Sequence, residues 1–375
     1  MKAPLRSRRD FIRTSALAAG SFPFISSLAS SALAAEGERK LNFCVVGLGS
    51  LSNGQIAPAL QKTKYCKLAG VVSGHPQKAQ TWKNRYNLDD KNIYDYDTMS
   101  KLADNPDIDV VYVVTPNALH AEHTIKALKA GKHVYCEKPM EATPEKCQEM
   151  IDAAKAANRM LGVAYRCQFD PNHLECFRFG KDKVYGPIKS LEANFGRTMS
   201  TTTEWRLQKA LAGGGPLMDV GIYALQTVRC VTGMEPISVT AKEVPKTDLV
   251  KFKEVEEGIN WELTFPGGIV ATCQTSYNKT GMNDFRIVAE KAAFGLQPAY
   301  GYTGCKGTIT DSAGTTTEIP RVAGFDQFAA EMDDFAQCIM NNKPTKVPGE
   351  EGLRDLKIMM AIYEAARTGQ PVKLA

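Results

Sequence analysis

The chain has 375 residues, of which 43% are hydrophobic and 23% are charged, and its formal net charge is +5. This composition excludes a disordered chain, a coiled coil and a disulfide-stapled miniprotein, and the length supplies apolar material for two hydrophobic cores. Five basic residues and one acidic residue fall within residues 1–35, so the rest of the chain is nearly neutral and we expect no nucleic-acid partner.

The first 34 residues have the pattern of an export signal. Ser7-Arg8-Arg9-Asp10-Phe11-Ile12-Arg13 precedes a mild Ala/Ser-rich apolar stretch over residues 14–33, and Ala32-Leu33-Ala34 offers a cleavage site. An ordinary secretory signal or a frayed helix is the alternative, but the paired arginines before Phe-Ile resemble a twin-arginine (Tat) signal. We therefore expect the Tat machinery to export a protein that has already folded, which places it in the periplasm.

Beyond the N-terminus the sequence indicates neither membrane insertion nor a disulfide framework. No apolar run of 18 residues occurs there. The ten cysteines are scattered, no C-x-x-C pair occurs, and several lie in apolar runs such as 43–46. We expect most of them to be buried small hydrophobic residues.

Residues 41–61 predict a strand, a glycine-rich turn and a helix in succession. The apolar strand 41–46 runs into Gly47-Leu48-Gly49-Ser50-Leu51-Ser52, and residues 55–61 have helical character. Glycines at the first two positions of a dinucleotide fingerprint allow a tight turn and the close approach of a pyrophosphate to the helix N-terminus. The third position is Ser52 instead of glycine, which is still small enough for contact between helix and strand.

Strands and helices alternate from this turn to residue 164. Strands are expected at 68–72, 109–114, 133–136 and 161–164, and helices at 76–86, 119–130 and 144–157. Continuous apolar strands that alternate with helices are typical of a parallel, doubly wound sheet. We therefore predict a Rossmann domain over residues 35–165.

The end of the second strand favours NADP over NAD. An NAD site requires an Asp or Glu there to bind the adenosine ribose, and residues 48–88 contain no acidic residue. Ser73 can instead donate to a 2′-phosphate, and Lys78 lies one helical turn into the next element, where its charge can neutralise that phosphate. Lys78 taken alone fits a solvated helix residue, so the missing acid carries this prediction.

The pattern changes after about residue 169. Helices are expected at 171–179, 327–340 and 352–368, and strands at 188–195, 237–242, 258–265, 269–276 and 285–289, with Pro266-Gly267-Gly268 as a hairpin turn. Antiparallel strands after a βαβ half imply an α/β fold in two parts. After the Rossmann doubly wound parallel sheet we predict a C-terminal α+β domain over residues 166–349, with a large open, mostly antiparallel sheet. Residues 350–375 are expected to form a C-terminal helix that packs back on the Rossmann domain.

Two motifs carry candidate catalytic residues. Glu137-Lys138-Pro139 follows a predicted strand at the edge of the sheet where open α/β folds bind ligands. Gly213-Gly214-Gly215 opens a helix on which Asp219 and Tyr223 are spaced i, i+4 and so face the same way. Each motif alone is more often a turn or a solvated helix face, so the prediction depends on their occurring together.

The residue types are consistent with oxidation of a sugar hydroxyl. A tyrosine can remove the hydroxyl proton only as a phenolate, and an unperturbed tyrosine has a pKa of about 10. Lys138 can supply the positive charge that favours the phenolate of Tyr223. His120 and His123 are spaced i, i+3, but no cluster of Cys or carboxylate residues supports them, so we expect no metal.

In combination these motifs resemble the Gfo/Idh/MocA oxidoreductases. The resemblance rests on Lys138 in E-K-P, on T-P-N-A-L-H at 115–120 and on the G-G-G-x-L-x-D helix, and it runs over residues 41–370. Within the family the likeness is to the glucose–fructose oxidoreductase branch, because Tyr223 stands where many members carry His.

The resemblance implies roles for individual residues. Lys138, Asp219 and Tyr223 are the expected catalytic residues, and the same three together with Tyr165 are expected to bind the substrate. The fingerprint and the resemblance together give the expected cofactor-binding residues: Gly47, Gly49, Ser50, Leu51, Ser73, Lys78, Thr115, Pro116, Asn117, His120, Glu137, Lys138, Arg166, Trp205 and Arg206. The resemblance also implies a homodimer or homotetramer.

The export signal and the nucleotide site together suggest a reaction. The periplasm has no nicotinamide pool, so an exported enzyme has to carry NADP(H) tightly bound and regenerate it in place. We expect a ping-pong sugar oxidoreductase that oxidises an aldose at C1 to a lactone and reduces a second sugar with the same cofactor. The branch uses a long arm to retain its cofactor, whereas cleavage after Ala34 leaves only residues 35–40 before the first strand.

Two alternatives are open at this point. A glycosidase of the same fold would use the bound nucleotide in a transient oxidation–elimination cycle, and it would cleave chromogenic glycosides without net redox change. A sugar-binding protein with a vestigial site would be unaffected by Tyr223→Phe.

Overall fold

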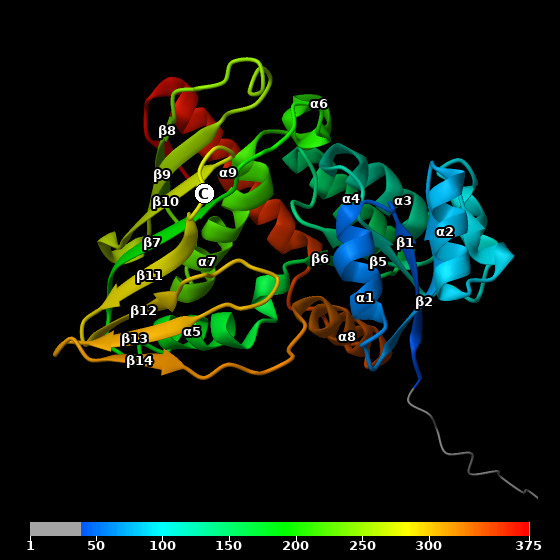
Figure 1. The fold of residues 1–375 in the computed structure, drawn as a ribbon, viewed down its shortest axis with the longest axis horizontal. Coiled ribbons are helices and arrows are strands. Elements are labelled where there is room, and N and C mark those ends of the chain that lie inside the picture. The colour runs from blue at the N-terminus through cyan, green and yellow to red at the C-terminus, as the bar shows by residue number, and fades with distance from the viewer. Residues whose placement is uncertain (1–38, 375) are drawn as a thin grey trace, which may run out of the picture. The chain divides into compact units, whose positions relative to one another are not determined.

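The strands between residues 41 and 164 form one parallel sheet (Figure 1). The structure, a computed structural model, describes residues 39–374, so the expected signal of residues 1–34 lies outside the described residues. The strand order is β3-β2-β1-β4-β5-β6, with β1 (Leu41–Val46), β2 (Cys66–Val72), β3 (Ile93–Tyr94), β4 (Val110–Val113), β5 (His133–Glu137) and β6 (Leu161–Ala164). This order confirms the predicted doubly wound Rossmann sheet, to which the structure adds the short strand β3.

The helices of this half begin and end where their sequences predict. Proline is the first residue of α2 (Pro76–Tyr86) and α4 (Pro144–Ala157), where its missing N–H costs no hydrogen bond. Both helices end at an asparagine in the left-handed conformation, with φ of 50°. Helix α3 spans His120–Lys129, and α1 (Ala57–Leu60) follows a π-helical turn at Ser52–Ile56.

A second sheet of nine strands follows in the chain. Its order is β14-β13-β12-β11-β7-β10-β9-β8-β15, with β7 (Ile188–Gly196), β8 (Ser238–Glu243), β9 (Gly258–Thr264), β10 (Val270–Ser276), β11 (Asn283–Ala289), β12 (Ala292–Leu296), β13 (Gly307–Asp311), β14 (Thr316–Ile319) and β15 (Val372–Lys373). Only the β7–β10 pair is parallel, which confirms the mostly antiparallel sheet. The predicted β9–β10 hairpin turns at Gly267 and Gly268, with φ of 82° and 80°.

Helices cover one face of the second sheet. α5 (Pro171–Lys181), α7 (Ile222–Thr232) and α9 (Gly349–Thr368) contact its strands. Along β9, Ile259, Trp261 and Leu263 are buried, whereas Asn260 and Glu262 between them are exposed. This alternation is typical of an antiparallel sheet with one covered and one solvated face. The sheet is therefore open, as predicted.

The last two helices connect the two halves. α8 (Gln327–Met340) contacts α1 and β2 of the parallel sheet, although the sequence analysis placed it in the second domain. α9 contacts α4 and β6, as expected, but also β8 and α7, and β15 joins the edge of the second sheet. The predicted boundaries of 166–349 and 350–375 therefore do not separate the halves, because segments from both ranges pack on each half.

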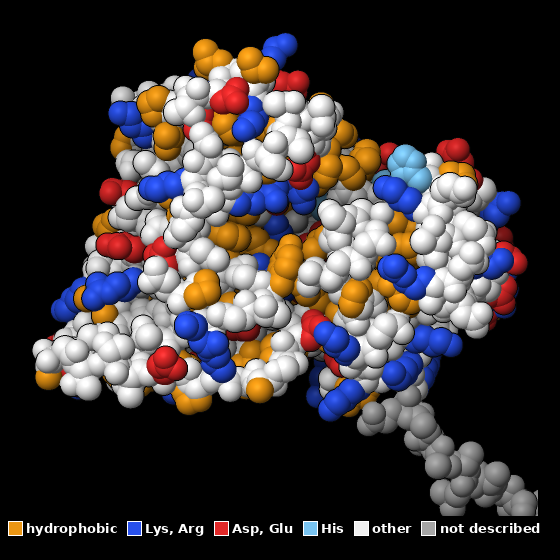
Figure 2. Space-filling view, in the orientation of Figure 1, with side chains coloured by type: hydrophobic (Ala, Val, Ile, Leu, Met, Phe, Trp, Pro, Cys, Tyr) orange, Lys and Arg blue, Asp and Glu red, His pale blue; other side chains and the backbone are white. Residues whose placement is uncertain are grey.

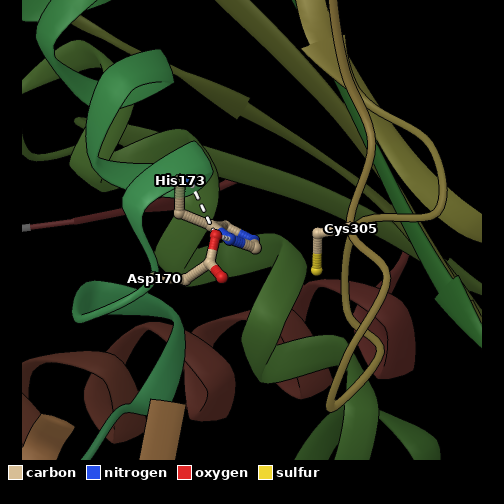
Figure 3. A group of neighbouring side chains, drawn as sticks. All are labelled: Asp170, His173 and Cys305. Atoms are coloured by element: carbon tan, nitrogen blue, oxygen red, sulfur yellow. Dashed lines mark hydrogen bonds and ion pairs between the residues drawn. The ribbon is translucent and has the colours of Figure 1, made fainter. Parts of the chain in front are cut away.

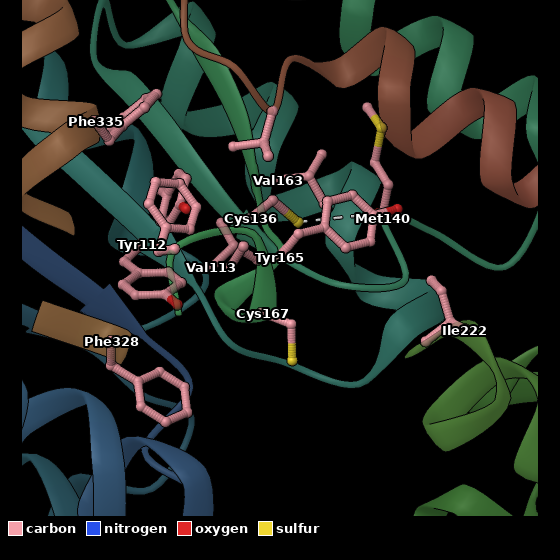
Figure 4. Close-up of a cluster of buried hydrophobic side chains, with 14 of the residues drawn as sticks. Tyr112, Val113, Cys136, Met140, Val163, Tyr165, Cys167, Ile222, Phe328 and Phe335 are labelled. Atoms are coloured by element: carbon pink, nitrogen blue, oxygen red, sulfur yellow. Dashed lines mark hydrogen bonds between the residues drawn. The ribbon is translucent and has the colours of Figure 1, made fainter. Parts of the chain in front are cut away.

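One cluster of buried apolar side chains runs through both halves. Figure 4 shows part of it, with Tyr112 and Val163 of the parallel sheet, Phe335 of α8 and Ile222 of α7 among the residues drawn. The rings of Tyr135 and Phe335 are 4.7 Å apart between centroids. The two expected cores are therefore joined into one, which holds the halves together.

Two further expectations concern the described residues as a whole. None of the helices in residues 39–374 is long and apolar enough to cross a membrane. All ten cysteines lie in this range and are free, and only Cys230 and Cys338 are not fully buried. The cysteines are thus small interior residues, as predicted.

Candidate active site

A cavity of about 820 Å³ opens at the carboxyl ends of β1, β4 and β5, where it also meets residues of the second half. Figure 2 shows basic side chains gathered in the hollow at the centre of the view. The structure brings the predicted cofactor-binding and catalytic residues together as its lining: Gly47, Gly49, Ser50, Leu51, Ser73, Lys78, Thr115, Pro116, Asn117, His120, Glu137, Lys138, Arg166, Trp205, Arg206, Asp219 and Tyr223.

The glycine-rich turn has the shape of a pyrophosphate cradle. Gly47 has φ of +92°, and a Cβ there would lie 2.7 Å from the carbonyl oxygen of Val114. A Cβ on Gly49 would meet nothing within 4 Å, so that side of the turn is open. Ser52 Oγ donates to the carbonyl oxygen of Gly47 at 2.5 Å and so fixes the turn. No side chain caps the start of the following helix, which leaves its N–H groups for an anion, and these residues fit a dinucleotide.

The far end of the cavity lies beyond the end of β2, where this fold binds the adenosine ribose of a dinucleotide. Ser73 and Lys78 line it, together with His75 and Tyr96, which the sequence analysis did not identify. Ser73 Oγ accepts a hydrogen bond from the backbone N–H of His75 at 3.1 Å. The carboxylates in the cavity lining are Glu137, Glu204 and Asp219, and none of them follows β2. His75 comes directly after the Ser-Gly turn, a position that could have identified it.

Lys138 lies between the other two predicted catalytic residues. Its Nζ donates to the backbone carbonyl oxygen of Asp219 at 2.7 Å, and it lies 3.8 Å from Asp219 Oδ1. The same Nζ stands 4.7 Å from the ring centroid of Tyr223. Lys138 therefore faces the ring of Tyr223 and does not hydrogen-bond its hydroxyl. Burial lowers the pKa of Lys138, against the charges of Asp219 and Glu137.

Arg166 is the cation that contacts the hydroxyl of Tyr223. Its Nε donates to Tyr223 Oη at 3.0 Å, and its guanidinium carbon lies 4.6 Å from the ring centroid. The remaining nitrogens donate to Gln327 Oε1 at 2.6 Å and to the carbonyl oxygens of Tyr300 at 2.7 Å and Gly301 at 3.1 Å. The expectation that Lys138 supplies the activating charge is therefore corrected. Burial raises the pKa of Tyr223 well above its ordinary value, and the charge of Arg166 opposes this rise.

Asp219 is surrounded by positive charge. Arg197 lies 3.1 Å from its carboxylate and Arg206 lies 3.2 Å from it, in addition to Lys138. Burial alone would raise the pKa of Asp219, but the charges of Arg206, Lys138 and Arg197 outweigh burial and lower it. Asp219 is therefore a carboxylate that can accept hydrogen bonds from a hydroxyl. The sequence analysis missed Arg197, which belongs to no motif.

The triple glycine lets the Asp219 segment approach its neighbours closely. A Cβ on Gly214 would lie 2.0 Å from the hydroxyl oxygen of Tyr363, and one on Gly215 would lie 2.5 Å from the carbonyl oxygen of Glu256. The buried carboxylate of Glu256 accepts from the N–H groups of Gly215 at 2.8 Å and Leu217 at 3.1 Å. Leu217–Gly221 is a π-helical turn ahead of α7, a feature often found at functional sites. Glu256 thus positions Asp219 and Tyr223.

The histidines at the start of α3 make hydrogen bonds within the protein, and His120 also lines the cavity. His120 places one ring nitrogen 3.0 Å from the carbonyl oxygen of Pro139 and the other 2.8 Å from that of Thr115. It therefore joins the loops after β4 and β5, and burial lowers its pKa to about 4. His123 instead contacts Thr115 Oγ1 at 3.1 Å and stacks on Tyr96.

Tyr165 is not brought to the cavity. It is buried on the opposite side of the chain from Arg166, where it faces Asp355 of α9. The structure therefore gives no support to the predicted contact between Tyr165 and the substrate.

A buried polar group, shown in Figure 3, is linked to Arg166 through Gln327. It consists of Asp170, His173 and Cys305, whose polar atoms lie within 4.8 Å of one another. Asp170 Oδ1 binds His173 Nδ1 at 2.9 Å and caps α5, and Asp170 Oδ2 accepts from Gln327 Nε2 at 3.0 Å. Because Gln327 also binds Arg166, this group holds Arg166 in place.

Comparisons with known proteins agree with this architecture. A family model described as "Oxidoreductase family, NAD-binding Rossmann fold" matches residues 41–165, and a second one, described as "GFO/IDH/MocA C-terminal domain", matches residues 178–294. The chain is 38% identical to an aldose-aldose oxidoreductase from Caulobacter crescentus whose structure was solved with glycerol; the match covers 90% of this chain and 100% of that one, with a TM-score of 0.87.

Two curated relatives extend the comparison. A D-xylose 1-dehydrogenase (NADP(+)) of Haloarcula marismortui is 28% identical over 90% of this chain and 94% of its own length. A D-glucoside 3-dehydrogenase of Escherichia coli K12 is 28% identical over 86% of this chain and 95% of its own. With both halves of the fold matched, the chain belongs to the Gfo/Idh/MocA family of oxidoreductases.

Proposed function

We propose that this protein oxidises an aldose at C1 to the lactone and reduces a second sugar with the same NADP(H), which stays bound throughout. The observation that carries the proposal is one cavity with the glycine-rich turn at one end and Lys138, Asp219 and Tyr223 at the other. The similarity to an aldose-aldose oxidoreductase and to sugar dehydrogenases supports the choice of sugars as substrates.

The residues of the cavity have different roles in the proposed reaction. The chemistry that a nicotinamide would supply in this cavity is acceptance and return of the hydride. Tyr223 takes or returns the hydroxyl proton at Oη, while Arg166 Nε holds that oxygen in place and favours its ionised form. Asp219, kept ionised by its cations, accepts hydrogen bonds from sugar hydroxyls. Lys138 fixes the Asp219 backbone beside the Tyr223 ring and adds positive charge where a hydroxyl oxygen ionises.

NADP is the cofactor that we propose. Ser73 and Lys78 line the cavity where the adenosine ribose of a dinucleotide lies in this fold, and no carboxylate among the described residues is placed to bind an unmodified ribose. The NADP(+) in the name of the xylose dehydrogenase relative is consistent with this choice.

Export, retention and assembly are further parts of the proposal. The Ser7–Arg13 pattern supports export to the periplasm by the Tat machinery. With no nicotinamide pool in that compartment, the cofactor has to remain bound and be reoxidised by a second sugar. The solvated face of the second sheet offers a large surface for a homodimer or homotetramer.

The test is to purify the mature protein and to identify the nucleotide released by denaturation. We expect about one NADP(H) per chain. D-Xylose or D-glucose should raise the NADPH fluorescence of the enzyme in a single turnover, and a second sugar should reverse the rise, with ping-pong kinetics. An empty protein that needs a continuous supply of free nucleotide contradicts the proposal, and so does cleavage of chromogenic glycosides without net redox change.

A further inference from the structure

Two buried carboxyl groups meet behind the cavity with a tyrosine between them. Glu137, at the end of β5, lines the cavity, and Glu331 of α8 has no exposed surface. Tyr112 Oη lies 2.9 Å from Glu137 Oε1 and 3.2 Å from Glu331 Oε1. Tyr135 Oη donates to Glu331 Oε2 at 3.3 Å. A chain of hydrogen bonds therefore runs from the cavity wall into the interior of the parallel sheet.

These hydrogen bonds determine how many protons the group holds. A phenol has one hydrogen and an ionised carboxylate has none, so Tyr112 can donate to only one of the two carboxyl groups. If both were ionised, the other would face the Tyr112 oxygen with no hydrogen between them, and two like charges would be buried side by side. One of Glu137 and Glu331 therefore carries a proton.

The surroundings place this proton on Glu331. Lys138 and Arg166 lie near Glu137 and favour its ionised form, although burial raises its pKa. For Glu331, burial and the charge of Glu137 raise the pKa well above its ordinary value, and they outweigh the hydrogen bonds of Tyr112 and Tyr135 and the charge of Arg166, which lower it. Tyr135 donates to Glu331, and burial holds Tyr135 in its neutral form; the charge of Lys346 also interacts with Glu331. Glu331 then donates to Tyr112, which donates to an ionised Glu137.

Glu137 is the carboxylate in the cavity lining that can gain a proton. Asp219 is held ionised by three cations, and Glu204 accepts a hydrogen bond from Arg206 at 2.6 Å. Glu137 has no ion pair within 4 Å among the described residues, and its pKa is already raised. Reduction of a nicotinamide ring removes that ring's positive charge, and loss of a positive charge in the same cavity raises the pKa of a carboxyl group further.

We propose that Glu137 takes up the proton that sugar oxidation releases and keeps it until the second sugar is reduced. This inference rests on the proposed function. In the first half-reaction the C1–H bond would break, its electron pair and hydrogen would leave as a hydride to the oxidised nicotinamide, and the C1 hydroxyl proton would pass to Tyr223 Oη and from there to Glu137 through the cavity that both residues line. In the second half-reaction the hydride would return to the carbonyl carbon of the second sugar, while Glu137 returns its proton to Tyr223, which gives it to the oxygen. The two half-reactions thus balance without exchange of a proton with the medium.

The test measures how many protons the enzyme releases to the medium for each NADPH that forms. Enzyme loaded with NADP+ is mixed with D-xylose in a weakly buffered solution with a pH indicator, while absorbance follows the NADPH formed. We expect the wild type to release much less than one proton per NADPH and Glu137→Gln to release close to one. Tyr112→Phe should also release close to one proton per NADPH. Without the hydrogen bond from Tyr112, Glu137 is already protonated before the sugar binds and cannot take up another proton.

Glu331→Gln is the matched control. The amide reproduces the hydrogen bond of a protonated Glu331 to Tyr112, so this variant should retain the proton as the wild type does. One proton released per NADPH by the wild type, or retention by Glu137→Gln, overturns the inference while leaving the proposed function intact. If no NADPH forms with any aldose, the proposed function fails and the inference fails with it.

Infrared difference spectra give a second readout, which follows the carboxyl groups themselves instead of the protons in solution. The resting enzyme should show the carbonyl stretch of one buried protonated carboxyl group, which is lost in Glu331→Gln. Addition of the aldose should produce a second such band besides that of the lactone; this second band shifts in 2H2O, as a carboxyl band does, and is absent from Glu137→Gln. A purely structural Glu137 would leave the carboxyl bands of the wild type unchanged on reduction, and that result would contradict the inference.

Discussion

At the scale of single residues, the role of Arg166 differs most between the expected and the observed site. It contacts the Tyr223 hydroxyl with Nε and uses its other nitrogens on Gln327, Tyr300 and Gly301. A planar fork is needed to make all these bonds from one side chain, and lysine has none. Tyr223 is therefore tuned by an arginine that several buried groups hold in place.

We expect Arg166→Lys to lower kcat for aldose oxidation by at least about tenfold. Arg166 opposes the rise of the Tyr223 pKa, so its loss raises that pKa, and oxidation should need a higher pH to reach half of its maximal rate. The measurement is the pH profile of the single-turnover rate. In a Tyr223→Phe background the same change should have little further effect, because the residue it acts through is gone. If the losses of kcat from Arg166→Lys and Tyr223→Phe were fully additive, Arg166 would act through a residue other than Tyr223.

The sequence predicted the site residues that belong to motifs and missed those that do not. The E-K-P and triple-glycine motifs identified Lys138, Asp219 and Tyr223, which line the cavity. Arg197 and Glu256 come from segments without a pattern, and only the folded chain brings them to Asp219 and its helix. Tyr165 directly precedes the 3₁₀ turn at Arg166–Gln168, and of these two neighbours only Arg166 lines the cavity.

At the scale of elements, the glycines of the site have two different functions. A Cβ on Gly214 would clash with Tyr363 at 2.0 Å, whereas one on Gly49 would meet nothing within 4 Å. The first glycine is required by packing and the second by a ligand that approaches the turn.

We therefore expect Gly214→Ala to destabilise the protein by about 1–3 kcal/mol, the usual cost of overpacking. Gly49→Ala, as the matched variant, should leave stability within about 0.5 kcal/mol and weaken the binding of NADP(H). Urea unfolding of the nucleotide-free proteins and titration with NADP+ measure the two effects separately. Equal losses of stability in both variants would contradict this division.

Secondary structure was predictable where periodicity and end signals agreed. Helices α2, α4 and α8 have the expected bounds, because a proline, asparagine or aspartate marks their ends. Strands β12, β13 and β14 were not expected, since the segment that contains β13 and β14 is rich in Gly and Thr and pairs only through tertiary contacts. The π-helical turn at Leu217–Gly221 follows from the packing around Glu256, which no local pattern contains.

At the scale of the whole molecule, the buried carboxyl groups link folding to pH. Burial and the charge of Glu137 raise the pKa of Glu331. A raised carboxyl pKa means that the folded state keeps a proton that the unfolded state loses, so stability falls as pH rises through the interval between the two pKa values.

We expect Glu331→Gln to flatten this dependence. Between about pH 5 and about pH 8 the wild type should lose more stability than the variant, by about 1.4 kcal/mol for each unit of pKa shift crossed. Denaturant unfolding at both pH values measures the difference, and Glu350→Gln, on an exposed side chain, is the control. A wild type and variant with parallel pH profiles would show that Glu331 is ionised in the folded protein.

The late position of α8 and α9 in the chain affects when the nucleotide half can fold during synthesis. Both helices pack on the parallel sheet, α8 on α1 and β2 and α9 on α4 and β6, yet they come from residues 327–340 and 349–368 at the end of the chain. A nascent chain on the ribosome that has completed every strand of the nucleotide half still lacks α8 and α9. Phe328 of α8 lines the cavity, so the cavity wall is complete only after this helix has been made, and a product truncated before α8 would lack that part of the site.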